Sequence, residues 1–379
     1  MYRCRVCFII SLFLACLSLN ANAQAKFQKS LSVSFETGPL ISNGKVWADE
    51  IKNSVAYRGI DVRLGWRNLS NNYVNHLHRY PTFGLGFTSS VYYFPEIGRS
   101  QAFYGFFEIP FSHKGNQKKF QMGYFLQIGI GYNLNPYDSI SNPLNQYIGS
   151  NLNAFIHFGI KADYRISDRV QFFASGGLKH YSNGSTKKPN AGINLAPVAI
   201  GIRTNFGEIQ KIPSETPFYP DLEKRGFWNF ALYTGFKNYD IGKSAYFRGG
   251  LGFNYLWELN YKFRIGLGTD LFYASGMADR FPEGDFNFKD KTSVAIVASG
   301  EWKLTDKLFM PMGVGIYLYR NEANQEVSGF YERIGFRYRF MDQFSAGLQI
   351  KAHKAKADFF EFTLGYTIPG KVKYTTSKR

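Results

Sequence analysis

Apolar and polar residues alternate along most of this chain. Between Gln121 and Asn133, one set of alternate positions is mostly Gly, Gln and Asn, and the other is apolar, namely Met122, Tyr124, Leu126, Ile128, Ile130 and Tyr132. The segment 152–166 repeats the split, with Asn153, His157, Lys161, Asp163 and Arg165 on its polar side. Successive side chains of a β-strand point to opposite faces, so a period of two predicts strands with one apolar face.

Segments of this kind fill both halves of the chain. The first half contains eight of them, at residues 30–38, 54–66, 82–95, 100–113, 119–133, 151–166, 169–182 and 190–206, and about eight more fit the second half. The alternation stops between Gly207 and Gly226, where three prolines stand among charged residues, and clustered prolines are typical of a boundary. We therefore expect two all-β repeats, at residues 24–208 and 226–379, joined by a linker at 209–225.

A strand face that is apolar from end to end needs an apolar environment. No segment after the N-terminus offers the ~20 apolar residues of a membrane-spanning helix. Strands with one face toward lipid and one toward a polar interior are typical of antiparallel transmembrane β-barrels. Aromatic residues make up 18% of the chain and Gly numbers 38, as expected for aromatic girdles and close packing inside a barrel. The two repeats predict either two barrels or one larger barrel of about sixteen strands.

The N-terminus has the features of a secretory signal peptide. Arg3 and Arg5 precede an apolar run, and small residues at 21–23 provide a cleavage site, which predicts a signal peptide at residues 1–23. Lipoprotein processing at Cys16 is the alternative. All three cysteines lie in this segment, so the mature chain offers no thiol for a disulfide, a metal site or a nucleophile. Export and a barrel together predict the bacterial outer membrane as the location.

The charge of the chain favours an anionic lipid surface as its partner. The formal net charge is +17, and loss of Arg3 and Arg5 with the signal peptide lowers it by only two. Basic residues suit anionic lipid headgroups, whereas an exported protein rarely meets nucleic acid. His76 and His78 share a strand face, but no cysteine or cluster of third ligands accompanies them. We therefore expect neither a metal site nor another cofactor.

The candidate chemistry lies in the segment 169–206, which reads as two strands and a loop. His180 and Ser182 fall on the same face as the apolar residues before them, so an apolar stripe ends in two polar groups. Folding about Lys187 brings Asn194, on the returning strand, opposite His180. On a barrel this face meets lipid, which predicts a site that acts on a molecule in the bilayer. The structural alternative is an ordinary polar strand end before a tight turn.

The stretch HYSNGSTKKPNAGIN, from His180 to Asn194, resembles the motif of the outer-membrane lipid A 3-O-deacylases, an acyloxyacyl-hydrolase-like family of eight-stranded barrels. The resemblance covers the first half of the chain. It implies a catalytic triad on the lipid-facing side of the barrel that removes the acyl chain esterified at position 3 of lipid A. By this resemblance His180 is the general base and Ser182 is the nucleophile. The oxyanion loop then consists of Asn183, Gly184 and Ser185, and Asn190 matches a characteristic Asn.

One position departs from the family pattern, because the family's Glu corresponds to Asn194. Asp163 does not easily replace it, since its strand parity points it into the lumen. An Asn can still orient the imidazole through its amide oxygen, as in Cys-His-Asn sites, but it supplies no charge to stabilise the imidazolium. We therefore expect His180, Ser182 and Asn194 to form a catalytic group that is slow, differently tuned or inactive.

The second half resembles a distant copy of the first without the motif. Its DQFSAGLQIKAH, which ends at His353, matches DRVQFFASGGLKH, which ends at His180, once a one-residue gap is allowed. His353 falls on the polar, lumen-facing side, and Ala355 stands where a Ser would be needed. Glu361 is the expected luminal partner of His353. This repeat therefore predicts a second barrel without a catalytic motif.

These observations predict an outer-membrane serine ester hydrolase that removes an ester-linked acyl chain from lipid A of lipopolysaccharide in the outer leaflet. The alternative is a non-catalytic outer-membrane β-barrel that is structural, porin-like or binds lipopolysaccharide through its basic loops. The two functions differ in whether Ser182 and His180 meet on the outer face and in whether Asn194 supports them.

Overall fold

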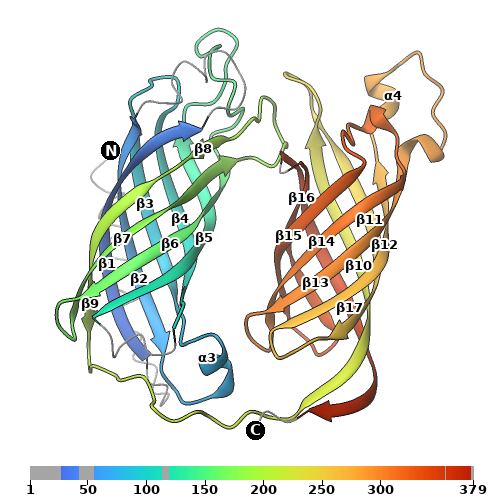
Figure 1. The fold of residues 1–379 in the computed structure, drawn as a ribbon. Coiled ribbons are helices and arrows are strands. Elements are labelled where there is room, and N and C mark those ends of the chain that lie inside the picture. Colours follow the sequence, from blue (N-terminus) through green and yellow to red (C-terminus); the bar gives the residue numbers. More distant parts are fainter. Residues whose placement is uncertain (1–26, 42–54, 113–118, 355, 377–379) are drawn as a thin grey trace.

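The computed structural model describes residues 27–41, 55–112, 119–354 and 356–376. The predicted signal peptide, residues 1–23, lies outside the described residues. Figure 1 shows two β-barrels that stand side by side with their axes roughly parallel, and the segment between them crosses at one end of the pair.

The first barrel is a closed antiparallel sheet. Its strands are β1 (Phe27–Ile41), β2 (Val55–Asn68), β3 (Thr82–Tyr92), β4 (Gly98–Pro110), β5 (Phe120–Leu134), β6 (Asn153–Arg165), β7 (Val170–Ser182), β8 (Ile193–Leu195) and β9 (Val198–Phe206). Each strand from β1 to β7 pairs with the next, and β9 pairs with both β7 and β1, which closes the ring. The short β8 precedes β9 in the same position between β7 and β1. Pro197, which has no N–H for the ladder, lies in the interruption between them.

The second barrel is also closed. Its strands are β10 (Leu222–Asn238), β11 (Ala245–Glu258), β12 (Phe263–Ala274), β13 (Thr292–Lys303), β14 (Leu308–Tyr319), β15 (Phe330–Arg339), β16 (Phe344–His353) and β17 (Lys356–Thr376). The prediction of an all-β antiparallel barrel fold with about eight strands in each half is confirmed. Because β10 pairs with β17 and β9 pairs with β1, the strands form two small barrels and not one larger barrel.

Short helices occur only in the connections of the described residues. Helix α3 (Tyr73–Leu77) lies between β2 and β3, and the Asn72 side chain caps it by accepting a hydrogen bond from the Asn75 N–H. This helix accounts for a connection that is longer than a simple turn. Helix α4 (Met277–Arg280) and the 3-10 turns η2 (Lys289–Lys291) and η3 (Glu322–Asn324) lie in the connections of the second barrel. No helix in the described ranges is long and apolar enough to cross a membrane.

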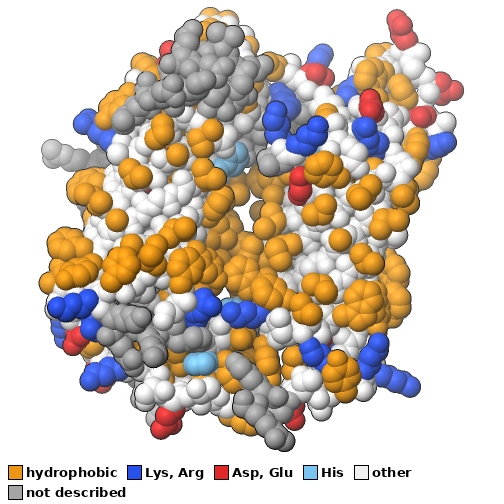
Figure 2. Space-filling view, viewed as in Figure 1, with side chains coloured by type: hydrophobic (Ala, Val, Ile, Leu, Met, Phe, Trp, Pro, Cys, Tyr) orange, Lys and Arg blue, Asp and Glu red, His pale blue; other side chains and the backbone are white. Residues whose placement is uncertain are grey.

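Side chains alternate between the outer and inner faces of both barrels. On β1, Phe35 is 64% exposed whereas its neighbour Ser34 is buried; on β17, Phe362 is 61% exposed whereas Glu361 is fully buried. Figure 2 shows hydrophobic side chains over the walls of both barrels, with charged side chains gathered toward the two ends. This is the distribution that a hydrocarbon layer around the barrels requires.

Buried ion-pair networks lie in the lumens of both barrels. In the first barrel, Glu108 accepts hydrogen bonds from Arg63 (2.8 Å), Lys161 (3.2 Å) and Arg203, and all four side chains are buried. In the second barrel, Arg333 pairs with Asp270 and Glu361. Because these charges are removed from water, each depends on its partner for stabilisation.

The expected pairing of His353 with Glu361 is wrong. Glu361 binds Arg333, with the closest N···O distance at 2.6 Å. His353 does point into the lumen, where its Nε2 lies 3.0 Å from the Tyr317 hydroxyl and its Nδ1 lies 3.8 Å from Asp358. Arg333 takes the carboxylate because its longer side chain spans from β15 to β17 and makes two hydrogen bonds to it.

The two barrels contact each other directly. In the walls, the ring of Phe107 lies 6.4 Å from the rings of Phe336 and Trp302. At the end that carries the linker, Tyr73 of α3 donates a hydrogen bond to Asp306 of the second barrel (2.9 Å), and His76 lies 2.8 Å from the hydroxyl of Tyr219 in the linker. These contacts join residues far apart in the sequence, so they fix how the barrels stand relative to one another.

The luminal network of the first barrel gives a stability prediction. Glu108→Gln keeps the shape of the side chain but leaves Arg63, Lys161 and Arg203 with less compensating charge, so we expect a loss of about 3 to 5 kcal/mol in the free energy of unfolding. Urea unfolding in lipid vesicles, followed by tryptophan fluorescence, measures this loss. The matched control is Glu322→Gln, because Glu322 pairs with Arg320 on the surface and should change stability by less than ~1 kcal/mol. Equal effects of the two substitutions would contradict the prediction.

Candidate active site

Strand β7 carries His180 and Ser182 on its outer face. Leu178 and Phe172, which share their parity, are 44% and 51% exposed on the barrel wall, whereas Lys179 and Tyr181 are buried in the lumen. The two polar groups therefore stand at the end of an apolar stripe, next to the loops that lie opposite the linker (Figure 1). A polar group in such a position needs a hydrogen-bond partner.

Each polar group finds that partner within the site. His180 Nε2 lies 2.8 Å from Ser182 Oγ, and His180 Nδ1 lies 2.6 Å from Asn194 Oδ1. Asn194 is on β8, directly opposite His180 in the ladder between β7 and β8. The Asn194 oxygen can only accept, so Nδ1 carries the proton and Nε2 is free to accept the Ser182 hydroxyl proton. This is the arrangement of a serine nucleophile, a general base and an orienting group.

Gly192 supports the imidazole and was not found by sequence reasoning. Its φ is +77°, and a Cβ atom there would lie 2.6 Å from His180 Cε1. The His180 ring therefore occupies the space that any other residue at 192 would need. The Gly192 N–H donates to the Tyr147 carbonyl (2.9 Å), which ties this support to the loop between β5 and β6. In the sequence, Gly192 is visible only as a glycine two positions before Asn194. The alternation of strand faces by itself does not connect it with His180.

A tight turn follows Ser182. Gly184 and Ser185 have φ values of +59° and +61°, and the Thr186 N–H bonds to the Asn183 carbonyl at 3.3 Å. Positive φ at both central positions defines a type I′ turn. The five residues from 181 to 185 are all buried, and Ser182 is only 2% exposed. The first three residues of the turn are therefore buried, although they lie at the end of a strand, whereas Thr186 is exposed.

Asn183 holds this turn in place. Its backbone N–H donates to Asn190 Oδ1 (3.0 Å), and its side-chain amide donates to the Ser150 hydroxyl (2.9 Å) and the Lys187 carbonyl (2.8 Å). Its donors are thus engaged within the loop. Ser150, in the long polar loop after β5, is a second residue that sequence reasoning did not assign to the site.

Several donors near Ser182 have no hydrogen-bond partner among the described residues. In the described part of the chain, no hydrogen bond uses the backbone N–H of Gly184 or of Ser185, or the side-chain NH2 of Asn190. Donors of this kind beside an activated hydroxyl can stabilise the oxyanion that forms when a carbonyl is attacked. The site therefore has the elements needed for acyl transfer.

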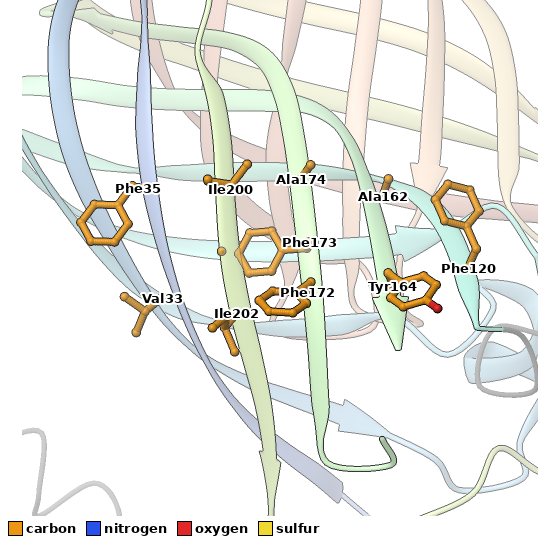
Figure 3. A pocket seen from close by; sticks show the side chains of 11 residues that line it. Val33, Phe35, Phe120, Ala162, Tyr164, Phe172, Phe173, Ala174, Ile200 and Ile202 are labelled. Carbon is orange, nitrogen blue, oxygen red and sulfur yellow. The ribbon is translucent and has the colours of Figure 1, made fainter. Parts of the chain in front are cut away.

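An apolar hollow on the barrel wall lies away from this chemistry. It has a volume of about 580 Å³ and is lined by side chains of β1, β5, β6, β7 and β9, including Phe35, Phe120, Tyr164, Phe172 and Ile200 (Figure 3). The small side chains of Ala162 and Ala174 leave the space between these larger ones. Ala174 is eight residues before Ser182, about 26 Å along the strand at ~3.3 Å per residue. The hollow therefore belongs to the lipid-facing wall and not to the Ser182 site.

The histidines outside this site have other surroundings. His76 and His78, which share a predicted face, lie in and after α3, where His76 bonds to Tyr219. Burial and the nearby Lys262 charge lower the pKa of His78 to about 4. Within the described ranges, no group of three or more His, Cys, Asp or Glu residues has the geometry to hold a metal ion.

Comparisons with known proteins divide the chain as the two barrels do. Residues 59–203 match the family model Lipid A 3-O-deacylase (PagL), and residues 226–371 match the model Acyloxyacyl hydrolase, C-terminal domain. No curated protein matches the chain.

Several solved structures are similar to parts of the chain. They include Neisserial surface protein A (12% identity, 48% of this chain and 97% of that chain, TM-score 0.29) and a mutant of the Rh. blastica porin (8%, 91% and 100%, TM-score 0.17). A third is CdiB from Acinetobacter baumannii (9%, 92% and 61%, TM-score 0.18).

The contact between Gly192 and His180 gives a prediction. Gly192→Ala should push the imidazole off Ser182, so labelling of Ser182 by a serine-directed fluorophosphonate should slow by roughly 10- to 100-fold, the usual cost of misplacing a reacting group by about 1 Å. Mass spectrometry of the labelled peptide gives the rate. Gly207→Ala is the control, because Gly207 has a similar φ of +78° but no atom within 4 Å of the added Cβ. Equal labelling of both variants would show that Gly192 does not support His180.

Proposed function

We infer from its family that the protein is an outer-membrane serine ester hydrolase that removes an ester-linked acyl chain from lipid A. Residues 59–203 of this chain belong to the lipid A 3-O-deacylase family, and residues 226–371 belong to the acyloxyacyl hydrolase C-terminal domain family. One observation carries the proposal. Ser182, His180 and Asn194 form a hydrogen-bonded series at the end of the apolar outer stripe of β7, with His180 Nε2 2.8 Å from Ser182 Oγ and His180 Nδ1 2.6 Å from Asn194 Oδ1.

The proposed reaction is acyl transfer to water in two steps. His180 Nε2 takes the Ser182 proton as Oγ attacks the ester carbonyl carbon, and the N–H groups of Gly184 and Ser185 with the Asn190 amide stabilise the oxyanion. The intermediate collapses when the sugar oxygen leaves with the proton from His180. Water, deprotonated by His180, then attacks the acyl-Ser182 carbonyl, and the fatty acid departs as Ser182 regains its proton. The chemistry requires no cofactor.

The height of the site suits a substrate in the outer leaflet. Ten steps of ~3.3 Å from Val170 to His180, on a strand tilted by ~40°, rise about 25 Å, which is the height of the apolar band of such barrels. The ester would then lie at the outer rim, with its acyl chain along the apolar wall below Leu178. Lys187 and Lys188 in the adjacent loop supply positive charge near the lipid A phosphates.

The lumens give no support to a porin-like function. Lys161 and Lys179 in the first barrel and Lys351 and Glu326 in the second are at most 2% exposed, whereas a water-filled channel leaves its lining polar groups hydrated. Binding of lipopolysaccharide without hydrolysis is the remaining alternative, and it predicts a protein that retains lipid A but leaves it intact.

Removal of either reacting group tests the proposal. Ser182→Ala and His180→Ala should each lower lipid A deacylation by about 10³-fold or more without unfolding the barrel, because neither side chain takes part in the luminal packing. Mass spectrometry of lipid A from cells with and without each variant measures the loss of acyl chains and the position cleaved. His353→Ala is the control and should leave deacylation unchanged, since His353 lies in the second lumen. Equal loss in all three variants would place the site elsewhere.

Substitution of Asn194 tests the departure from the family pattern. In Asn194→Glu, a carboxylate beside His180 Nδ1 would stabilise the imidazolium that forms when the Ser182 proton is taken. Turnover near neutral pH should rise by a factor on the order of 10 to 10⁴, bounded by the loss that the Asp-to-Asn change causes in serine proteases. The rate of fatty acid release from purified lipopolysaccharide measures it. A fall in turnover would show that the 2.6 Å contact with Asn194 is suited to an amide.

A further inference from the structure

The second barrel reaches the turn that follows Ser182. The ring of Phe360, on β17, lies so close to Gly184 that a Cβ atom there would be 2.1 Å from Phe360 Cδ2. The backbone N–H of Asn238, the last residue of β10, donates to the Ser185 carbonyl at 2.7 Å. The Ser185 hydroxyl in turn donates to the Ala357 carbonyl at 3.4 Å. Three contacts from the second barrel thus converge on two residues of the first.

The backbone of these two residues is left-handed. Both have positive φ, which Gly184 adopts freely but which strains Ser185, because Ser185 has a Cβ atom. A strained backbone of this kind persists only when its surroundings hold it. Within the first barrel, the Thr186 N–H and the Asn183 donors hold the ends of the turn, whereas Asn238, Ala357 and Phe360 contact its centre.

We infer that the second barrel is a positioning element of the hydrolase site, which clamps Gly184 and Ser185 so that their N–H groups face the oxyanion. This inference rests on the proposed function. It assigns the catalytic groups to one barrel and the geometry of their oxyanion donors to the other. Phe360 is the positioning residue that a substitution can test, because the second barrel makes its other two contacts through the backbone atoms of Asn238 and Ala357.

The neighbouring charge supports the same contact. Burial lowers the pKa of Lys188, in the loop after the turn, and the carboxylates of Asp358 and Asp240 oppose that shift. Both carboxylates belong to the second barrel. Lys188 therefore interacts with carboxylates of β17 and of the connection after β10.

Phe360→Ala tests the inference, with Phe362→Ala as the matched control. Phe362 lies on the same outer face of β17, two residues further along, and is 61% exposed. If Phe360 positions the oxyanion donors, its loss should lower kcat for lipopolysaccharide deacylation about 10- to 100-fold and leave KM within about 2-fold. Fluorophosphonate labelling of Ser182 should slow by a similar factor. Phe360→Leu, which restores an apolar side chain against Gly184, should recover most of the rate.

The outcomes separate the two proposals. The first outcome is that the Phe360→Ala and Phe362→Ala variants both react within 2-fold of the wild-type rate while keeping the heat-modifiable mobility of a folded barrel in SDS gels. This result would overturn the positioning role of Phe360 and leave the proposed hydrolase function intact. A higher rate in Phe360→Ala would overturn it as well, because the second barrel would then obstruct the site. A wild-type chain that is labelled at Ser182 but leaves lipid A intact would overturn the proposed substrate, while the labelling ratio still decides the positioning role. A wild-type chain that is neither active nor labelled would overturn both.

Discussion

Closure of each sheet on itself is the constraint on which the rest of this structure depends. A closed sheet has no unpaired edge, and it separates its two faces completely, so alternate residues of every strand lie in different surroundings. Lys161 and its neighbour Ile160 illustrate the separation, because the Lys is buried among ion pairs and the Ile is exposed on the wall. The lumens of both barrels can therefore be filled with charge while their walls remain apolar.

The same separation explains where chemistry can occur on the outer face. A polar group in the middle of the apolar wall would lack partners and lose hydration, whereas at the end of a strand it can pair with the loops. His180 and Ser182 stand at such an end, and they are bonded to each other and to Asn194. Under the proposed function, this end is also the height at which an ester of an outer-leaflet lipid lies.

The two barrels share a fold but differ in what their corresponding histidines do. His180 points outward to Ser182, whereas His353 points into the lumen toward Tyr317 and Asp358. A shift of one residue along a strand is enough to move a side chain from the lipid-facing side of the barrel to the lumen. The second barrel then takes part in the site by contact, since Phe360 and the backbone of Asn238 reach the turn after Ser182.

The sequence by itself determined the class of fold, the presence of about eight strands in each half and the faces of His180, Ser182 and Asn194, because a period of two sets which side chains share a face. It also indicated the lipid A deacylase family through the stretch from His180 to Asn194. Only the tertiary structure decided that the strands close into two barrels, that Glu361 pairs with Arg333, and that Gly192, Ser150 and Phe360 surround the site. These contacts join residues that are distant in sequence, and no local periodicity records which strands and loops meet across a barrel or between two barrels.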